Sequence, residues 1–179
     1  YKGIFTILSS CASRQLEEVT FRRTVIPVQE LLDAAGKYFK KLMKNRPERI
    51  ELEIESMEAK VIGDVNQLRF LLENLIDEAL TVREDGVIRL QARKDNEYIR
   101  FLFTDTRREK SVEELNQLFY PNLARMTSGE KGELRGTEYL VCKQIIRDHD
   151  EFAGRRGCRI NAEPAEGGGF TVYFTIPRR

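Results

Sequence analysis

The chain has 179 residues, a length that favours a single domain with a hydrophobic core. Lysine and arginine number 30 against 29 for aspartate and glutamate, and this net charge of +1 argues against a general nucleic-acid-binding protein. No run of about 18 apolar residues is present, so the sequence indicates neither a membrane span nor membrane contact. The first residue is Tyr1, which suggests a segment of a longer protein.

The cysteines and the single histidine argue against two kinds of site. Cys11, Cys142 and Cys158 form no CxxC pair, and two of them lie in apolar patterns. We interpret them as small buried hydrophobic residues in a reducing compartment, which predicts a cytoplasmic location for this part of a parent protein. His149 has no cysteine or second histidine nearby, which argues against a zinc site.

The first predicted elements are helices. A helix is expected over residues 1–22, and its apolar stripe should pack on the domain or on a partner chain. Residues 24–27 are expected to break this helix. Pro27 then begins a second predicted helix that runs to about Asn45.

The next elements in the chain are mostly strands, predicted where apolar and polar residues alternate. Their ranges are 50–55, 60–63, 87–94, 98–104, 158–163 and 170–176. Strands 87–94 and 98–104 are expected to form a β-hairpin. The glycines at 167–169 lie between two strands, so we interpret them as a hairpin turn and not as a phosphate-binding loop.

A helix predicted over residues 64–81 is the centre of the expected site. Asp64 is its expected N-cap, with Gln67 as capping-box partner. One apolar face is buried, and a stripe of oxygen-bearing side chains runs beside it. The stripe contains Asn74, Asp77, Glu78 and Thr81. Such a stripe suits Mg²⁺, but the helix alone favours the simpler interpretation of a solvated edge.

Two later helices complete the predicted fold. One covers residues 111–119, with Ser111 as N-cap and Glu114 at the capping-box position. The other covers residues 136–149, and its buried face is predicted to contain Leu140, Val141, Ile145 and Ile146. The order of elements is an α+β pattern. It predicts a two-layer α/β sandwich, with helices on one face of a mixed, mostly antiparallel sheet, plus the N-terminal helix.

The order of the elements and their motifs resemble the ATP-binding domain of sensor histidine kinases, a Bergerat fold shared with gyrase B and heat-shock chaperone ATPases. The segments that carry the resemblance are 64–69 and 74–79 (the N box), 103–106 (the strand end with the adenine-binding aspartate), 118–121 (the F box), 136–149 (the helix after the second glycine box) and 158–177 (the closing hairpin). Residues 1–23 resemble the end of a dimerisation helix and its linker, and residues 24–179 resemble the ATPase domain.

The resemblance implies that ATP and Mg²⁺ bind to this chain. The nucleotide-binding residues that it implies are Asn74, Asp77, Glu78, Asp105, Lys131, Gly136, Thr137 and Thr171. Asn74 and Glu78 are the implied metal ligands. Asp105 is the implied acceptor of a hydrogen bond from the adenine amino group.

Several positions depart from the family pattern. Glu78 stands where the family has a second asparagine. Arg107 and Glu109 replace the glycines of the first glycine box, where glycine allows positive φ values without strain. Glu138 replaces a glycine of the second box, and its charge opposes an anion there.

These departures leave the function open between two alternatives. The first is the ATP-binding module of a sensor histidine kinase-like protein, with impaired activity in two-component phosphoryl transfer. The second is a pseudokinase domain with weak or no nucleotide binding, acting as a protein-interaction and signalling module. A gyrase- or chaperone-type clamp ranks far lower, because those families place a general-base glutamate where Asn74 stands.

The expected partners follow from the same resemblance. They are ATP, the dimerisation and phosphoacceptor domain of a parent chain, a response regulator and, through the N-terminal helix, a second copy of the chain. The family's phosphate-accepting histidine lies on a helix that this segment lacks, and His149 matches a structural histidine. Whether the chain is an enzyme is therefore left open.

Overall fold

The structure is a computed structural model that describes residues 20–121 and 137–179. Most of the helix predicted over residues 1–22 lies outside these ranges, and the described residues 21–23 have no regular secondary structure. Within the described parts of the chain, no helix is long and apolar enough to cross a membrane.

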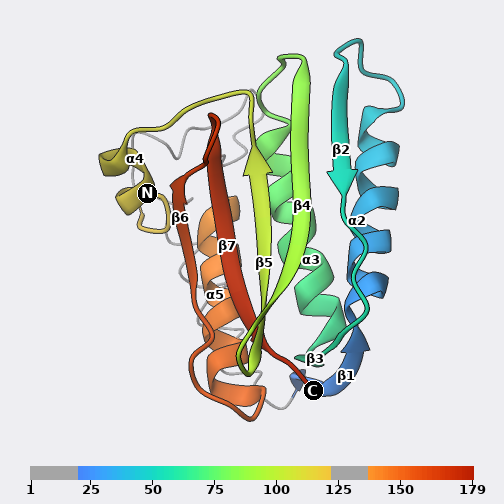
Figure 1. The fold of residues 1–179 in the computed structure, drawn as a ribbon, viewed down its shortest axis with the longest axis vertical. Coiled ribbons are helices and arrows are strands. Elements are labelled where there is room, and N and C mark those ends of the chain that lie inside the picture. Colours follow the sequence, from blue (N-terminus) through green and yellow to red (C-terminus); the bar gives the residue numbers. More distant parts are fainter. Residues whose placement is uncertain (1–19, 122–136) are drawn as a thin grey trace.

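A five-stranded sheet with the order β2-β4-β5-β7-β6 forms one layer (Figure 1). Its strands are β2 (Ile50–Ile54), β4 (Gly86–Asp95), β5 (Tyr98–Asp105), β6 (Ile160–Pro164) and β7 (Phe170–Pro177). Strand β2 runs parallel to β4, and the other pairs are antiparallel, including the predicted β4–β5 hairpin. The prediction of a mixed, mostly antiparallel sheet is confirmed.

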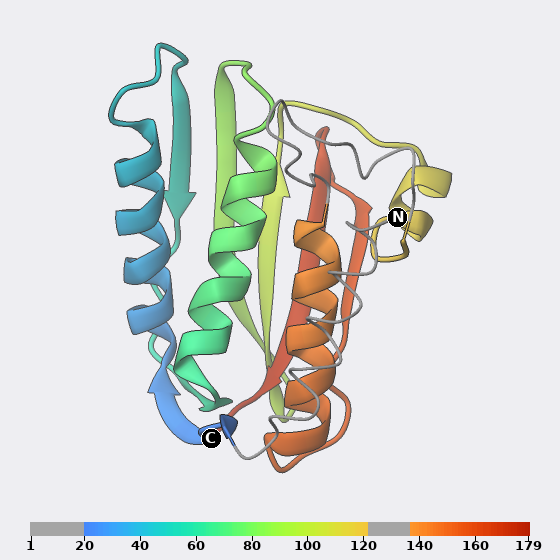
Figure 2. The ribbon, with the colours of Figure 1, turned by 180° about the vertical axis from the view of Figure 1, so that it is seen from behind.

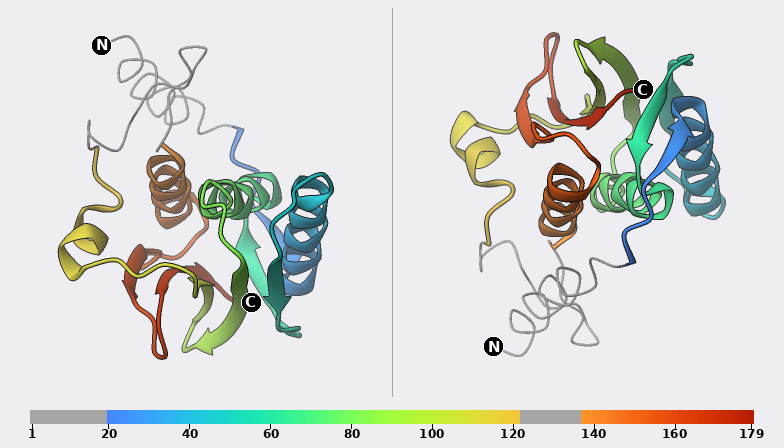
Figure 3. Two further views of the ribbon diagram at one scale, coloured as in Figure 1. Left: turned by 90° about the horizontal axis from the view of Figure 1, so that it is seen from above. Right: turned by 90° about the horizontal axis from the view of Figure 1, so that it is seen from below.

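Three helices form the second layer on one face of the sheet (Figures 2 and 3). They are α2 (Val28–Met43), α3 (Val65–Ala79) and α5 (Glu138–Phe152). Alternate residues of β5 point into the core between the layers, where the rings of Phe101 and Phe174 stack with centroids 4.9 Å apart. The short helix α4 (Val112–Gln117) contacts β6 at the edge of the sheet and has the predicted Ser111–Glu114 capping box.

The buried face of α5 differs from its prediction. Ile145 and Ile146 are buried as predicted, but Leu140 and Val141 are only partly buried. Tyr139 and Cys142 are buried in the core instead. The helix begins at Glu138, two residues later than predicted. Tyr139, Cys142, Ile146 and His149 then share one face at helical spacing.

Strand β1 (Thr24–Pro27) was missed by the sequence analysis, which expected these residues only to break a helix. It pairs antiparallel with β3 (Lys60–Gly63) in a separate two-stranded sheet, and Ile26 is buried. A segment of four residues that ends in proline is too short to show a clear alternation of apolar and polar side chains. Pro27 is the N-cap of α2, so the helix begins one residue later than predicted.

The N-cap of α3 is confirmed, but its predicted capping-box partner is wrong. Asp64 Oδ1 accepts hydrogen bonds from the N–H groups of Asn66 at 3.0 Å and Gln67 at 3.2 Å. The Asp64 N–H, however, donates to Nε2 of His149 at 3.0 Å, and the buried Oε1 of Gln67 has no hydrogen-bond partner among the described residues. Because Nε2 accepts, Nδ1 carries the proton and donates to the carbonyl oxygen of Ile145 at 2.8 Å. His149 therefore joins α5 to the start of α3.

The two cysteines within the described residues, Cys142 and Cys158, are buried free thiols, as predicted. Burial raises the pKa of the Cys142 thiol and raises that of Cys158 to about 12. Cys11 lies outside the described residues. Thiols held in the protonated form are poor nucleophiles, so Cys142 and Cys158 serve the packing of the core.

Candidate functional site

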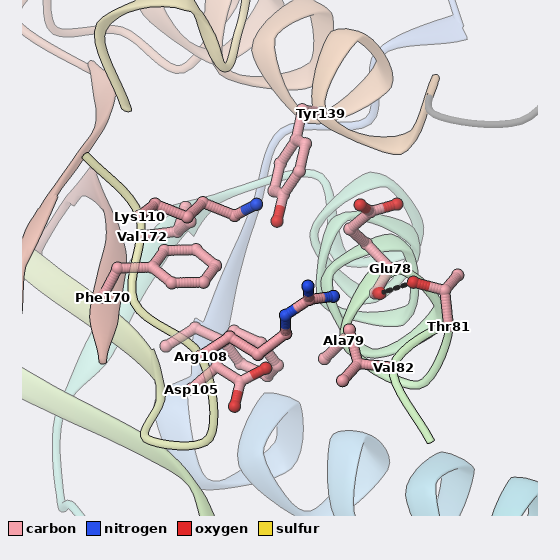
Figure 4. A pocket seen from close by; sticks show the side chains of 11 residues that line it. Glu78, Ala79, Thr81, Val82, Asp105, Arg108, Lys110, Tyr139, Phe170 and Val172 are labelled. Carbon is pink, nitrogen blue, oxygen red and sulfur yellow. Dashed lines mark hydrogen bonds between the residues drawn. The ribbon is translucent and has the colours of Figure 1, made fainter. Parts of the chain in front are cut away.

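A cavity of about 100 Å³ lies where the end of α3 faces the ends of β5 and β7 and the first turn of α5 (Figure 4). The antiparallel register pairs Asp105, the last residue of β5, with Phe170, the first residue of β7. Apolar and aromatic walls come from Ala79, Val82, Phe103, Tyr139, Phe170 and Val172. Among the described residues, the charged side chains at the cavity are Glu78, Asp105, Arg108 and Lys110.

The sequence-predicted site residues do not all meet at this cavity. Glu78 and Asp105 line it, and Asn74, Asp77, Thr137 and Thr171 do not. Thr171 Oγ1 lies 2.7 Å from Thr104 Oγ1 on the paired strand. Since Phe170 and Val172 face the cavity, the alternation along β7 turns Thr171 to the opposite face of the sheet. Lys131 and Gly136 lie outside the described residues.

Asp105 is bound on both carboxylate oxygens by Arg107. The guanidinium donates from Nε to Oδ1 and from Nη2 to Oδ2, each at 2.9 Å, and the Arg107 backbone N–H donates to Oδ1 at 3.0 Å. The Arg107 side chain is 1% exposed and that of Asp105 is 4% exposed. This is a buried, bidentate ion pair between residues two positions apart.

Arg107 also binds the end of α3 and the loop that follows it. Its Nη2 donates to the carbonyl oxygen of Ala79 at 2.6 Å, and its Nη1 donates to those of Val82 at 2.9 Å and Glu84 at 3.0 Å. The Ala79 carbonyl belongs to the last turn of α3, where backbone acceptors lack partners within the helix. The guanidinium therefore ties the end of α3 to the end of β5.

Gly86 makes room for the Arg107 side chain. The backbone of Gly86 has φ +144°, and a Cβ atom placed there would lie 2.5 Å from Cγ of Arg107. A side chain at this position would collide with the arginine stem. Gly86 and Arg107 are thus sterically matched.

Only one of the two predicted magnesium ligands, Asn74 and Glu78, lies at the cavity. Nδ2 of Asn74 donates to the carbonyl oxygen of Phe70 at 2.8 Å, and Asn74 is buried in α3 away from the cavity lining. Glu78 is the only predicted ligand that reaches the cavity, where Arg108 and Lys110 are also present. Within residues 20–121 and 137–179, no three histidine, cysteine, aspartate or glutamate side chains form a metal site. Mg²⁺ at a nucleotide site takes one or two protein oxygens together with phosphate oxygens and water, and the Glu78 carboxylate is the predicted ligand placed to supply one.

Asp77 faces α2 and not the cavity. Its Oδ1 accepts a hydrogen bond from the Tyr38 hydroxyl at 2.5 Å. Burial raises the pKa of Asp77, the bond from Tyr38 lowers it, and the charge of Glu138 raises it again, so that the net direction is upward. Burial and the contact with Asp77 also raise the pKa of Tyr38. Asp77 thus joins two helices of the second layer.

Arg108 and Lys110 were not identified from the sequence, because charged residues in a loop are usually only solvated. Figure 4 shows both side chains extending from the segment after β5 into the space between β7 and α3. Nζ of Lys110 lies 5.3 Å from the centroid of the Phe170 ring, a cation–π distance. The site therefore combines aromatic walls with two cations.

Comparisons with known proteins agree with this fold. The family described as "Histidine kinase-, DNA gyrase B-, and HSP90-like ATPase" matches residues 63–179. The catalytic domain of the histidine kinase ThkA is 21% identical, with a TM-score of 0.67 over 88% of this chain and 97% of that chain. The mycobacterial sensor histidine kinase MprB is 18% identical, with a TM-score of 0.68 over 88% of this chain and 99% of that chain.

A solved complex of ThkA with the response regulator protein TrrA is also similar. It is 18% identical, with a TM-score of 0.68 over 99% of this chain and 49% of that chain. A comparison with curated proteins gave no match. At these identities the solved structures establish the fold, and the family match over residues 63–179 establishes membership. The chain belongs to the family of histidine kinase-, DNA gyrase B- and HSP90-like ATPases.

Proposed function

We propose that this chain is the ATP-binding module of a sensor histidine kinase-like signalling protein, and that Arg107 weakens its nucleotide binding. The observation that carries the proposal is the bidentate bond from Arg107 to Asp105. Asp105 is the residue that family resemblance implies as the acceptor for adenine. In this chain the carboxylate already has a partner.

The number of free acceptor positions on Asp105 explains why binding is weakened and not abolished. A carboxylate offers about four acceptor positions. Arg107 takes two on Oδ1, through its backbone N–H and Nε, and one on Oδ2. The remaining position can accept an adenine amino group, but the adjacent guanidinium already neutralises the carboxylate charge.

Two further observations support weak binding. Glu138 begins α5 and places a carboxylate at the helix N-terminus, where backbone N–H groups favour a phosphate. The cavity of about 100 Å³ is also smaller than the roughly 300–1,000 Å³ of ordinary ligand sites. Binding of the adenine base and binding of the phosphates should both be weaker here than in a site with an unpaired Asp105 and a glycine at position 138.

The partners in this proposal are a phosphoacceptor domain and a response regulator. The solved complex of ThkA with TrrA supports the second partner by similarity of fold. The chain supplies nucleotide to a phosphoryl transfer that is completed by residues of other domains. Catalysis of this kind depends on positioning and on charge stabilisation.

The alternative is a pseudokinase domain that acts only through protein contacts. The arrangement of Asn74 favours it, because this amide donates to the Phe70 carbonyl and does not reach the cavity. A site that lacks both Asn74 and a free Asp105 has lost two of its implied nucleotide contacts. The two alternatives differ in whether any nucleotide binds.

Calorimetric titration with a non-hydrolysable ATP analogue and Mg²⁺ tests the proposal. We expect a dissociation constant near the millimolar range, about −4 kcal/mol. Micromolar affinity would contradict the weakening by Arg107. If neither the wild type nor an Arg107→Gly variant binds at several millimolar analogue, the chain is a pseudokinase domain and the proposal fails.

A further inference from the structure

We infer that the free edge of strand β6 binds an extended, acidic segment of a partner protein, which pairs with β6 as an added strand. This surface is separate from the candidate nucleotide site, since the described residues that line that cavity include none from β6. Three features lie together at this edge of the sheet. They are unpaired backbone groups, an apolar groove beside them and an excess of positive charge at the groove.

The pairing of β6 with β7 uses only alternate residues of β6. Strand β6 is the last in the order β2-β4-β5-β7-β6, so its second edge is not paired within the sheet (Figure 1). The N–H of Thr175 donates to the carbonyl oxygen of Arg159 at 3.0 Å, and the N–H of Ala165 donates to that of Gly169 at 2.9 Å. Both bonds fall on odd-numbered residues of the β6 segment. In an antiparallel pair, the residues between such positions direct their N–H and C=O groups away from the partner strand.

The backbone groups of Ile160 and Ala162 therefore face the free edge of the sheet. No other described residue forms a hydrogen bond with them there. Pro164 is in the same frame, and an outward-facing position on an edge strand is where a sheet tolerates a residue without an N–H. Two N–H donors and their neighbouring carbonyl acceptors are thus available for a short added strand.

A groove of about 780 Å³ lies along this free edge, between β6, α4 and α5. All six residues from 158 to 163 line it. One face of a strand presents only alternate residues, so a wall of six consecutive residues is the edge of the strand. Buried apolar side chains also line the groove, namely Leu115, Phe119, Ile146 and Ile160. Unpaired backbone groups beside apolar pockets are the features that bind an added β-strand.

The charges at the groove favour an acidic segment. Lys143, Arg147 and Arg159 line it, against Glu163 as the one carboxylate among the described lining residues, so two positive charges are in excess. None of these three cations forms a salt bridge with a carboxylate in the described parts of the chain. Arg147 and Arg159 are both exposed. Acidic side chains on the partner would complement these charges.

The positions of the two arginines specify the spacing of the acidic residues. Ile160 is buried in the core, so its neighbour Arg159 points to the face of the sheet without helices. Arg147 belongs to α5, on the other face. Successive residues of an added strand also point to opposite faces. Two adjacent acidic residues therefore reach Arg147 and Arg159 at the same time.

The probe is a peptide of the sequence acetyl-Thr-Val-Glu-Glu-Val-Thr-amide, titrated into the whole chain and followed by NMR at single amides. We expect a dissociation constant below about 1 mM. In the free chain, the N–H groups of Ile160 and Ala162 should exchange with solvent faster than those of Asn161 and Glu163, which face β7. Saturating peptide should slow exchange at Ile160 and Ala162 by about tenfold or more.

Two sets of variants separate the charge from the strand pairing. Arg147→Glu combined with Arg159→Glu should weaken binding by about tenfold or more. Lys40→Glu with Lys37→Glu is the matched control, because both lysines lie on α2, at the opposite side of the helix layer (Figure 2). This control should leave the affinity within about twofold. Of two peptides N-methylated at alternate residues, one in each frame, only the peptide methylated on the amides that face β6 should lose binding.

Each other result overturns the inference. Failure of the peptide to bind, or equal binding by the wild type and the arginine variant, excludes recognition of an acidic segment. Equal binding of a peptide with two lysines in place of the glutamates excludes it as well. Binding without slower exchange at Ile160 and Ala162, or binding of both methylated peptides, excludes an added strand. A dimer of the chain that protects these two amides without peptide would assign the edge to a second copy.

Discussion

Arg107 and Asp105 are paired through both carboxylate oxygens, with Nε–Oδ1 and Nη2–Oδ2 distances of 2.9 Å. The same guanidinium binds the carbonyl oxygen of Ala79 at the end of α3. One side chain thus occupies the carboxylate implied in adenine recognition and fixes the helix beside it. In the proposed function, Arg107 and the adenine amino group compete for Asp105.

Asp105→Ala should destabilise the domain, because it leaves the buried Arg107 charge unpaired. Loss of one partner of a buried ion pair costs about 3–5 kcal/mol. Urea unfolding measures this loss. Asp95→Ala is the control, since Asp95 pairs with Arg100 at the exposed surface, and its cost should be about 0–1 kcal/mol. Equal, small losses in both variants would contradict the role of Arg107 as a buried link.

Gly86→Ala should cost about 1–3 kcal/mol of unfolding free energy, from the left-handed φ of +144° and from the collision with Arg107. In an Arg107→Gly background the collision is removed and only the backbone strain remains. A double-mutant cycle by urea unfolding therefore predicts a smaller cost for Gly86→Ala in that background. Additive costs would show that the two residues do not interact.

His149→Ala should destabilise the domain by about 2–4 kcal/mol, because it removes a buried ring and leaves the Asp64 N–H without its acceptor. Thermal or urea unfolding measures the effect. Gln67→Ala is the matched control, since Gln67 was the predicted capping-box partner and makes no such bond. Its cost should stay within about 0.5 kcal/mol. A larger loss for Gln67→Ala than for His149→Ala would restore the capping box predicted from the sequence.

Asp77→Asn should stabilise the domain at neutral pH. The pKa of Asp77 is raised in the folded state, so folding favours its protonated form, and wild-type stability gains from this group as the pH falls. That gain is complete below the ordinary value of 3.8 and is lost as the pH rises through the folded pKa. The asparagine side chain in Asp77→Asn does not ionise, so the variant lacks this dependence of stability on pH.

The advantage of Asp77→Asn should therefore be largest near pH 7 and smallest below pH 3.8. Urea unfolding of both proteins across this range measures it. A variant that is less stable than the wild type at pH 7 would show that the Tyr38–Asp77 hydrogen bond outweighs the cost of burial.

The fold could be predicted largely from local patterns. The β4–β5 hairpin has clear alternation with a turn between its strands, and Ser111 and Glu114 are three residues apart, so both were correct. Strand β1 was missed because its pairing partner β3 is distant in sequence and its own pattern is short. The Asp64–His149 bond links residues 85 positions apart, a contact that no local rule could supply.

The candidate site could be predicted only in part, because several of its contacts also join residues that are distant in sequence. The motif around Asp105 marked the strand end, and the replacement of glycine by Arg107 was visible as a departure. The partners of that arginine were not visible, because the carbonyl oxygens of Ala79, Val82 and Glu84 come from a different part of the chain. Arg108 was not singled out from the sequence, and the structure places it at the cavity.

The measurement that tests the central claim most directly is a parallel titration of the wild type and Arg107→Gly with an ATP analogue and Mg²⁺. Urea unfolding first confirms that the variant is folded, and Arg107→Lys serves as a second variant that keeps a positive charge but loses the paired contact. Release of Asp105 should raise affinity by about tenfold or more in Arg107→Gly and by less in Arg107→Lys. Equal or weaker binding by both folded variants would show that Arg107 does not restrain this site.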